Sequence, residues 1–327
     1  MKNILVTGGA GFIGSNLVLE LQSRFPQAWI TILDGFRSAN FKNLQDFNGD
    51  LIAADMAALD WKQQFGEPQW DAVFHLASIT NTMEHDQRLQ VHDNVEGFRK
   101  LLEFLKPRQT PLVFASSAST YGIATGVNRE TDKRAPANVY AFSKMLLENL
   151  ARHYTQNYPD WRMAGLRYFN VYGPREAHKG VMASMIYHLA QQMNANKRPR
   201  LFKFGEQKRD FVYVKDVVAM TIAALEAKSS FTILNAGTGT PRSFNDIVEI
   251  LNNLLGKKLK PDYFDNPLAH HQPHTEADMS HTLRELDGFH LQFSLEDGIR
   301  DYLESGFLIE AKKAAPQAAS KAKKKRA

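Results

Sequence analysis

The chain has 327 residues, of which 43% are hydrophobic, and it carries a formal net charge of +5 at pH 7 and no cysteine. This length can bury the core of one large α/β domain or two fused lobes, and the lack of cysteine excludes disulfides, thiolate metal sites and a cysteine nucleophile. No apolar run approaches the roughly 20 residues that cross a bilayer, and the chain runs from Met1 into a strand-like segment without a signal peptide, so we expect a cytoplasmic protein with no membrane partner.

Strand and helix patterns alternate through the first half of the chain. Strand-like segments rich in apolar residues lie at residues 2–7, 29–34, 51–54, 72–77, 111–116 and 162–168, and the first of them has the pattern of a strand buried on both faces. Helical spacing is found at residues 12–25, 87–105 and 140–157. We therefore expect residues 1–169 to form an NAD(P)-binding domain of the α/β class, with a Rossmann-type doubly wound parallel sheet.

The pattern loosens beyond Asn170. Short strands are predicted at residues 209–214 and 232–235, and helices at residues 182–193, 214–227 and 244–255. We expect residues 170–308 to form a smaller α/β substrate-binding lobe over the carboxyl edge of the sheet, where doubly wound folds bind their ligands. Strands of this second part can return to the first domain.

The net basicity comes from the end of the chain. Residues 311–327 contain seven Lys or Arg and no acid, and subtracting these seven charges from +5 leaves −2 for residues 1–310. The body is therefore nearly neutral, and nucleic acid is not an expected partner. We predict a disordered basic tail at residues 309–327, because a segment so poor in apolar residues cannot offset its ordering entropy. A weak contact with an anionic surface is the alternative.

A glycine-rich turn follows the first predicted strand and opens the first predicted helix. Its glycines are Gly8, Gly11 and Gly14, and Phe12 and Ile13 lie between them. Such a turn lets the backbone approach a pyrophosphate, and a helix N-terminus favours the anion through its free N–H groups and dipole. The pattern predicts a dinucleotide site, and a purely structural turn is the alternative.

An acid at the end of the second predicted strand supports this site. Asp34 lies 20 residues past Gly14, near the spacing of a ribose-binding carboxylate. A carboxylate favours NAD, whereas Arg37, with Lys42 further along, favours the 2′-phosphate of NADP. Three further cofactor contacts are expected at strand ends: Asp55, for which a helix N-cap is the alternative, and Ala77 and Ser78.

Tyr140 and Lys144 form a Y-x-x-x-K motif on one face of a predicted helix. A free tyrosine has a pKa of about 10 and is a poor base at neutral pH, but a nearby ammonium and a cationic nicotinamide both favour the phenolate. Ser117, at the carboxyl end of a predicted strand, can orient the hydroxyl group that is oxidised. Ser116 and Ser119 are competing assignments, because serines often cap turns.

With these motifs in this order, the chain resembles the extended short-chain dehydrogenase/reductases, the family of the sugar-nucleotide epimerases and dehydratases, over residues 1–308. A second block, R-Y-F-N-V-Y-G-P-R-E-A-H-K-G at residues 167–180, narrows this resemblance. Together with M-A-S-M at 182–185 and K-R-D-F-V-Y-V at 208–214, it is similar to the subfamily of ADP-L-glycero-D-manno-heptose 6-epimerases. These isomerases supply the heptose of the lipopolysaccharide inner core.

The resemblance implies a mechanism and further site residues. Hydride leaves C6 of ADP-D-glycero-D-manno-heptose for tightly bound NAD(P), giving a transient 6-ketone, and returns to the opposite face. Tyr140 would serve one face and Lys179 the other as the second base, with a mere surface lysine as the alternative. Substrate contacts are implied for Asn170 and His188 at the sugar, Arg209 at the diphosphate, and Phe202, Lys203, Phe204 and Gly205 at the nucleotide end. Cofactor contacts are implied for Gly35, Met56, Asn94 and Val171. No metal is expected.

Three positions depart from the subfamily pattern. His271 stands where a tyrosine often contacts the substrate, Val181 stands where a serine is sometimes found, and Asn40 replaces a lysine that helps to hold the 2′-phosphate in some relatives. The family precedent nevertheless leads to NADP, with NAD as the alternative. It also leads to a homo-oligomer, often a pentamer.

The sequence bears on three rival functions. A 4,6-dehydratase needs an acidic pair beside the catalytic hydroxyl, but Ala118 and Ser119 follow Ser117, which excludes it. A UDP-hexose 4-epimerase needs only Ser117, Tyr140 and Lys144 and is the alternative enzyme. A nucleotide-sensing protein on the same scaffold typically lacks the tyrosine or the lysine, and this chain has both.

Overall fold

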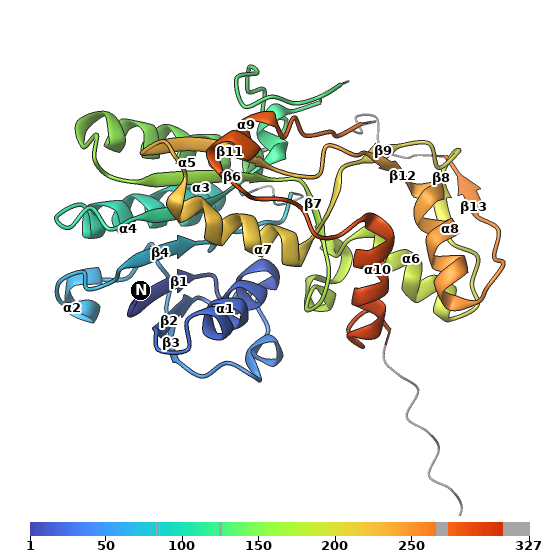
Figure 1. The fold of residues 1–327 in the computed structure, drawn as a ribbon, viewed down its shortest axis with the longest axis horizontal. Coiled ribbons are helices and arrows are strands. Elements are labelled where there is room, and N and C mark those ends of the chain that lie inside the picture. Colours follow the sequence, from blue (N-terminus) through green and yellow to red (C-terminus); the bar gives the residue numbers. More distant parts are fainter. Residues whose placement is uncertain (83, 85, 124–125, 266–273, 310–327) are drawn as a thin grey trace, which may run out of the picture.

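The computed structural model describes residues 1–309 except 83, 85, 124–125 and 266–273. The predicted basic tail beyond residue 309 and the predicted substrate residue His271 lie outside the described residues. Two parts stand side by side in Figure 1: a large sheet flanked by helices, and a smaller lobe that holds β8, β9, β12, β13, α6, α8 and α10. Among the described residues, no helix is long and apolar enough to cross a membrane.

The large part is built on one seven-stranded sheet in which every neighbouring pair is parallel. Its strands are β1 (Asn3–Thr7), β2 (Trp29–Asp34), β3 (Asp50–Ala53), β4 (Ala72–His75), β5 (Leu112–Ser117), β6 (Met163–Tyr168) and β11 (Phe231–Ala236). The order is β11-β6-β5-β4-β1-β2-β3, so the chain changes direction across the sheet between β1 and β4. Doubly wound sheets bind ligands at this switch point. The predicted fold class is confirmed.

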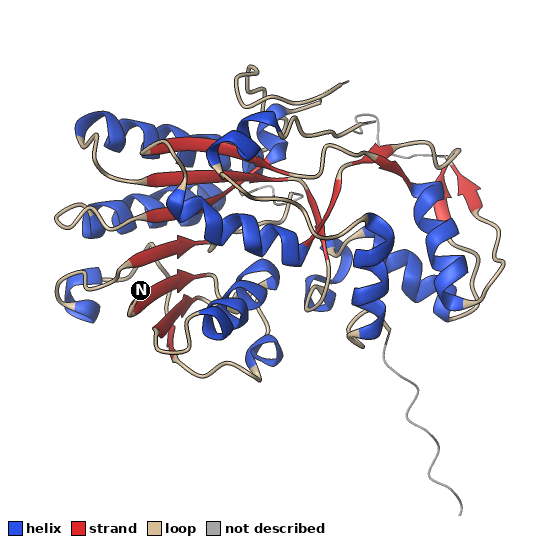
Figure 2. Cartoon of the chain, in the orientation of Figure 1, coloured by secondary structure: helices blue, strands red, loops and turns tan. Residues whose placement is uncertain are grey.

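Helices cover both faces of the sheet (Figure 2). One face carries α1 (Phe12–Arg24) and α7 (Val214–Ala223), which contact each other. The short turn η5 (Ala224–Glu226) follows α7. The other face carries α3 (Gln87–Val91), the π-turn η2 (His92–Glu96), α4 (Gly97–Leu105) and α5 (Val139–Asn157), with α2 (Trp61–Phe65) against α4. Successive β1 residues serve the two faces: Ile4 and Val6 belong to one buried cluster and Leu5 to the other. This explains the uninterrupted apolar run of the strand.

The second half of the chain contains three pairs of short strands outside the large sheet. Parallel pairs form between β7 (Asn170–Tyr172) and β10 (Phe211–Tyr213), and between β8 (Arg200–Phe202) and β13 (Asp262–Phe264). An antiparallel pair joins β9 (Lys208–Arg209) and β12 (Arg242–Ser243). The helical elements are η4 (Ala177–Met182), α6 (Met185–Asn194), α8 (Phe244–Leu255) and α10 (Leu295–Glu304). Two further short helices, η1 (Phe41–Leu44) and α9 (Ser280–Glu285), lie beside the large sheet, against α1 and β11.

Two predicted elements of the second half differ from the structure, and a third is confirmed but belongs to the large sheet. The helix expected from residue 182 begins at Met185, because Ser184 caps it by accepting from the Tyr187 N–H, and residues 177–182 form the separate turn η4. The strand expected at 209–214 is split at Asp210, whose carboxylate binds other loops. The strand expected at 232–235 is β11, which lies beside β6 in the large sheet, so the sheet continues past residue 169.

Candidate active site

A cavity of about 640 Å³ lies at the carboxyl ends of β1, β2, β4 and β5. All the catalytic and cofactor-binding residues predicted from the sequence line it. They come from the glycine turn, the β2, β3 and β4 ends, the π-turn, β5, α5, β7 and η4. Ser117 of β5 lines the cavity too, whereas the described substrate residues predicted in the smaller lobe are not among its lining residues.

The glycine turn forms the floor of the cavity. Gly8 has a φ of +72°, and a Cβ at Gly14 would lie only 2.0 Å from the Gly8 carbonyl oxygen, so neither position accommodates a side chain. A Cβ at Gly11 would meet only the Gly8 carbonyl, at 3.3 Å, and Gly11 itself lines the cavity. At Gly11 the backbone at the start of α1 therefore faces the cavity with no side chain in between. This cradle fits a dinucleotide pyrophosphate.

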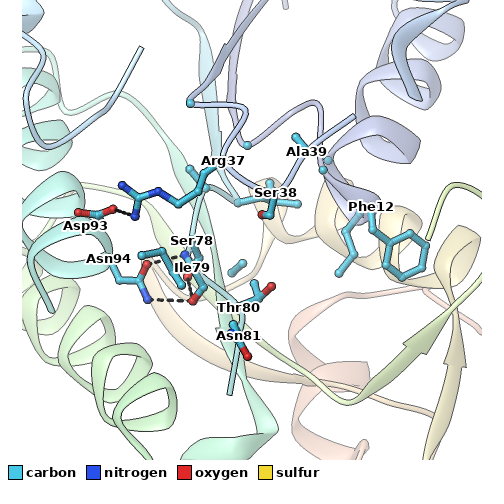
Figure 3. Close-up of a pocket in the computed structure, with 18 of the residues that line it drawn as sticks. Phe12, Arg37, Ser38, Ala39, Ser78, Ile79, Thr80, Asn81, Asp93 and Asn94 are labelled. Carbon is cyan, nitrogen blue, oxygen red and sulfur yellow. Dashed lines mark hydrogen bonds and ion pairs between the residues drawn. The ribbon is translucent and has the colours of Figure 1, made fainter. Parts of the chain in front are cut away.

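Asp34 ties the end of β2 to the glycine turn. The buried carboxylate accepts from the Ala10 N–H at 2.9 Å through Oδ2 and from the Phe36 N–H at 2.8 Å through Oδ1. Arg37 extends from the same loop and forms an ion pair with Asp93 of the π-turn, visible in Figure 3. Both partners line the cavity, so this pair joins two of its walls. The sequence analysis did not identify Asp93.

Asn94 binds the protein rather than pointing a free amide at the cavity. Its Oδ1 accepts from the Ile79 N–H at 2.7 Å, and its Nδ2 donates to the Ile79 carbonyl at 3.2 Å (Figure 3). The same Nδ2 also donates to Ser143 Oγ at 2.9 Å. These bonds hold the segment after β4, which includes Ser78, against α5. The π-turn that carries Asn94 is an irregularity often found at functional sites.

Tyr140 and Lys144 lie in the first two turns of α5. The helix begins after Asn138, whose side chain accepts from the Ala141 N–H at 2.8 Å. The buried Lys144 Nζ donates to the Ala115 carbonyl at 2.9 Å and lies 5.9 Å from the centroid of the Tyr140 ring. Burial lowers the pKa of Lys144 to about 7. Burial also raises the pKa of Tyr140, and a hydrogen bond with Ser117 opposes that increase.

The three candidate serines have different partners. Ser116 Oγ donates to the buried Glu148 Oε1 at 2.6 Å, and Glu148 also forms a bidentate salt bridge with Arg167. Ser119 Oγ donates to Ser117 Oγ at 2.8 Å. Ser117 is the serine that contacts Tyr140, so its hydroxyl is the one placed beside the phenol.

Lys179 lines the same cavity from η4, an element separate from the helix that carries Tyr140 and Lys144. Its Nζ is 5.3 Å from the centroid of the Phe12 ring at the start of α1. Burial lowers the pKa of the ammonium, and the charge of Glu176 opposes this. His178, for which the sequence predicted no role, also lines the cavity, and its Nδ1 lies 3.2 Å from the donor Asn43 Nδ2 and 2.9 Å from the acceptor carbonyl of Arg175.

The predicted substrate residues of the lobe form two groups. Asn170 of β7 accepts from Thr275 Oγ1 at 3.0 Å. Arg209 lies on β9, and its guanidinium carbon is 5.7 Å from the Phe244 ring centroid. Phe202 stacks edge-on against Phe264 at 4.9 Å between centroids. In the second group, Lys203 pairs with Asp265 and Phe204 is 64% exposed beside Tyr263, while Gly205 has a φ of +74°. His188 is half-buried on α6.

Comparison with known proteins gives consistent matches over this fold. The model of the NAD dependent epimerase/dehydratase family matches residues 4–237. The chain is 36% identical over 317 residues to an ADP-L-glycero-D-manno-heptose-6-epimerase of Alkalilimnicola ehrlichii, covering 92% of this chain and 97% of that protein. The crystal structure of the Helicobacter pylori ADP-L-glycero-D-manno-heptose-6-epimerase superposes with a TM-score of 0.85 at 38% identity, over 93% and 96% of the two chains. A UDP-glucuronic acid 4-epimerase of Bacillus cereus in complex with NAD superposes with a TM-score of 0.80 at 29% identity, over 93% and 99%.

Proposed function

The chain belongs to the NAD dependent epimerase/dehydratase family, and we propose that it inverts C6 of ADP-D-glycero-D-manno-heptose to give ADP-L-glycero-D-manno-heptose, a precursor of the lipopolysaccharide inner core. The observation that carries this proposal is the cavity that Tyr140 and Lys179 line together from two separate elements, α5 and η4. Inversion of one carbon through a ketone needs proton transfer at the same oxygen in two geometries. Two proton-transfer groups at one dinucleotide site meet this need.

Tyr140 is the base of the first half-reaction. It takes the proton of the C6 hydroxyl while the bound nicotinamide supplies the hydride acceptor and later the donor. Ser117 holds the hydroxyl, and Lys144 beside the ring favours the phenolate with its charge. Lys179 then donates the proton to the oxygen when hydride returns to the other face of C6, and the reverse reaction exchanges the two roles.

A UDP-hexose 4-epimerase is the alternative, and the likeness to the 4-epimerase of Bacillus cereus favours it. That reaction needs Ser117, Tyr140 and Lys144 but not Lys179. Lys179 lies at the cavity with its charge partly desolvated, which gives it a place in the chemistry that a surface lysine lacks. We therefore place the heptose first.

The substrate assay separates these two functions. The purified protein is incubated with ADP-D-glycero-D-manno-heptose and, separately, with UDP-glucose, and the products are identified by proton NMR. We expect conversion of the heptose at C6 and no UDP-galactose. Turnover of UDP-glucose alone would overturn the heptose assignment and support the 4-epimerase.

The cofactor is a nicotinamide dinucleotide, and we propose the phosphorylated form, NADP. Arg37 lines the adenosine end of the cavity on a half-exposed side chain, and turning from Asp93 would bring its guanidinium to a 2′-phosphate. Asp34 at the same end favours NAD, so the preference for NADP depends on the contact of Arg37 with the 2′-phosphate.

We expect Arg37→Ala to weaken NADP binding by roughly 10- to 100-fold, because hydrogen bonds to charged groups contribute about 1.5–3 kcal/mol and each 1.4 kcal/mol is tenfold. NAD binding should change little. Fluorescence titration of both dinucleotides measures this, with Arg24→Ala on the exposed side of α1 as the control. Equal losses for NAD and NADP would show that Arg37 does not read the phosphate.

The assembly and the compartment stay predictions. A homo-oligomer is proposed from the family, and light scattering of the purified protein gives its subunit count. The cytoplasm is proposed as the place where the enzyme acts.

A further inference from the structure

One acidic residue of the R-E-A-H-K block has no part in the mechanism above, yet it is entirely buried. Glu176 immediately precedes η4, three residues before Lys179, and its side chain has no exposed surface. A buried carboxylate is expensive unless it is hydrogen-bonded or paired. Its contacts therefore indicate what it does for the segment around it.

The Glu176 carboxylate binds both ends of the segment that carries Lys179. Oε1 accepts from the Gly173 N–H at 3.1 Å and from Ser184 Oγ at 2.8 Å, and Oε2 accepts from the Ser184 N–H at 2.5 Å. The backbone carbonyl of Glu176 accepts from the Lys179 N–H at 2.9 Å. Residues 173 and 184 are thus fastened to one side chain, and η4 projects between them toward the cavity.

The same carboxylate acts on Lys179 by its charge. Burial lowers the pKa of Lys179, and the negative charge of Glu176 raises it. Burial raises the pKa of Glu176, and the positive charge of Lys179 lowers it. The other titratable groups around the pair are Tyr140 and Lys144 of α5 and Asp34 of β2 across the cavity, His178 of the same turn, and Tyr187 and Tyr302 of α6 and α10 behind Glu176.

We propose that Glu176 is a positioning residue for Lys179: it fixes the 173–184 segment at both ends, and its negative charge acts on the ammonium three residues further along the chain. The idea rests on the proposed role of Lys179 as the second proton-transfer group. A residue that only braced the loop would leave the ionisation of Lys179 unchanged, whereas this one sets the pH range in which the lysine holds its proton.

The test measures the ionisation of Lys179 without substrate. The full-length protein is labelled with trace acetic anhydride between pH 6 and 11, and the acetylated fraction of the Lys179 peptide is measured by mass spectrometry. We expect Glu176→Gln to move the labelling midpoint to lower pH by about one unit, as expected for the loss of an opposite charge nearby. In the heptose assay, the limb of the kcat–pH profile that belongs to Lys179 should move in the same direction.

Ser184→Ala is the matched control, because it removes one donor to Glu176 and the cap of α6 but keeps the charge. Its midpoint should equal that of the wild type. An unmoved midpoint in Glu176→Gln, or an equal shift in Ser184→Ala, would overturn the proposal. If circular dichroism shows Glu176→Gln to be unfolded, Glu176→Asp replaces it, with a smaller downward shift expected and no shift counting against the idea.

The two failures are distinguishable. Loss of the proposed function appears as no turnover of the heptose by the wild type, whatever the labelling shows. Failure of the Glu176 proposal appears as an unmoved midpoint in a protein that turns over the heptose.

Discussion

Tyr140→Phe is expected to lower kcat for epimerisation by roughly 10²- to 10⁴-fold, the contribution typical of a positioned acid–base group. The substitution removes only the hydroxyl that contacts Ser117, and the ring beside Lys144 remains. Cofactor affinity should therefore change little. Stopped-flow or NMR assays of the heptose give kcat, and fluorescence titration gives the dinucleotide Kd.

Tyr154→Phe provides the matched control on the same helix. Its hydroxyl binds Glu103, outside the cavity lining, so activity should stay near the wild-type value. If Tyr140→Phe kept the activity of this control, the phenol would not be the base and the mechanism above would be wrong.

Lys179→Met is expected to cause a loss of similar size, roughly 10²- to 10⁴-fold in kcat, because one face of C6 then lacks its proton-transfer group. Methionine keeps the length and the apolar contact with Phe12 while it removes the charge. The glycine turn, Asp34 and Arg37 are untouched, so the dinucleotide should still bind. Comparison of kcat and cofactor Kd measures both effects.

Lys62→Met is the control for this change, since Lys62 is 81% exposed on α2 and does not line the cavity. Wild-type activity in Lys179→Met would eliminate the second base. A single-base reaction with a rotating substrate, as in the 4-epimerase alternative, would then be the better account.

The large sheet could be predicted because its signals are local. Most strands of the sheet are rich in apolar residues, and their alternation with helices predicts a parallel sheet. The glycine turn was predictable for the same reason: the steric need at Gly8 and Gly14 arises within a few residues of the chain. Ser117, Tyr140 and Lys144 could be named because strand ends and helix turns bring them to one edge.

Other features depend on contacts between distant residues, which no local pattern encodes. Arg37 and Asp93 are 56 residues apart in the sequence, and although Arg37 was predicted at the cofactor site, no local pattern pairs it with Asp93. The strands of the smaller lobe have two or three residues, too few to show a period. Asn94 lines the cavity, and its amide is also bound to Ile79 and Ser143, partners that only the fold brings near.

The return of β11 to the large sheet has the same cause. Its apolar run predicts a strand, but the partner of that strand is β6, more than sixty residues earlier, and the register Ile233↔Gly165 depends on a side chain that is missing. A Cβ at Gly165 would lie 2.7 Å from Ile233 Cδ1, so the glycine leaves room for this pairing. The sequence analysis could allow such a return without locating it.

The fate of the hydrogen on C6 tests the central chemistry most directly. ADP-D-glycero-D-manno-heptose that carries deuterium at C6 is converted in ordinary water, and the product is analysed by mass spectrometry and proton NMR. If hydride passes to a bound nicotinamide above Tyr140 and returns to the same carbon, the deuterium stays at C6 of the inverted product. Replacement of that deuterium by hydrogen from the solvent would contradict the redox mechanism and indicate inversion by proton abstraction from carbon.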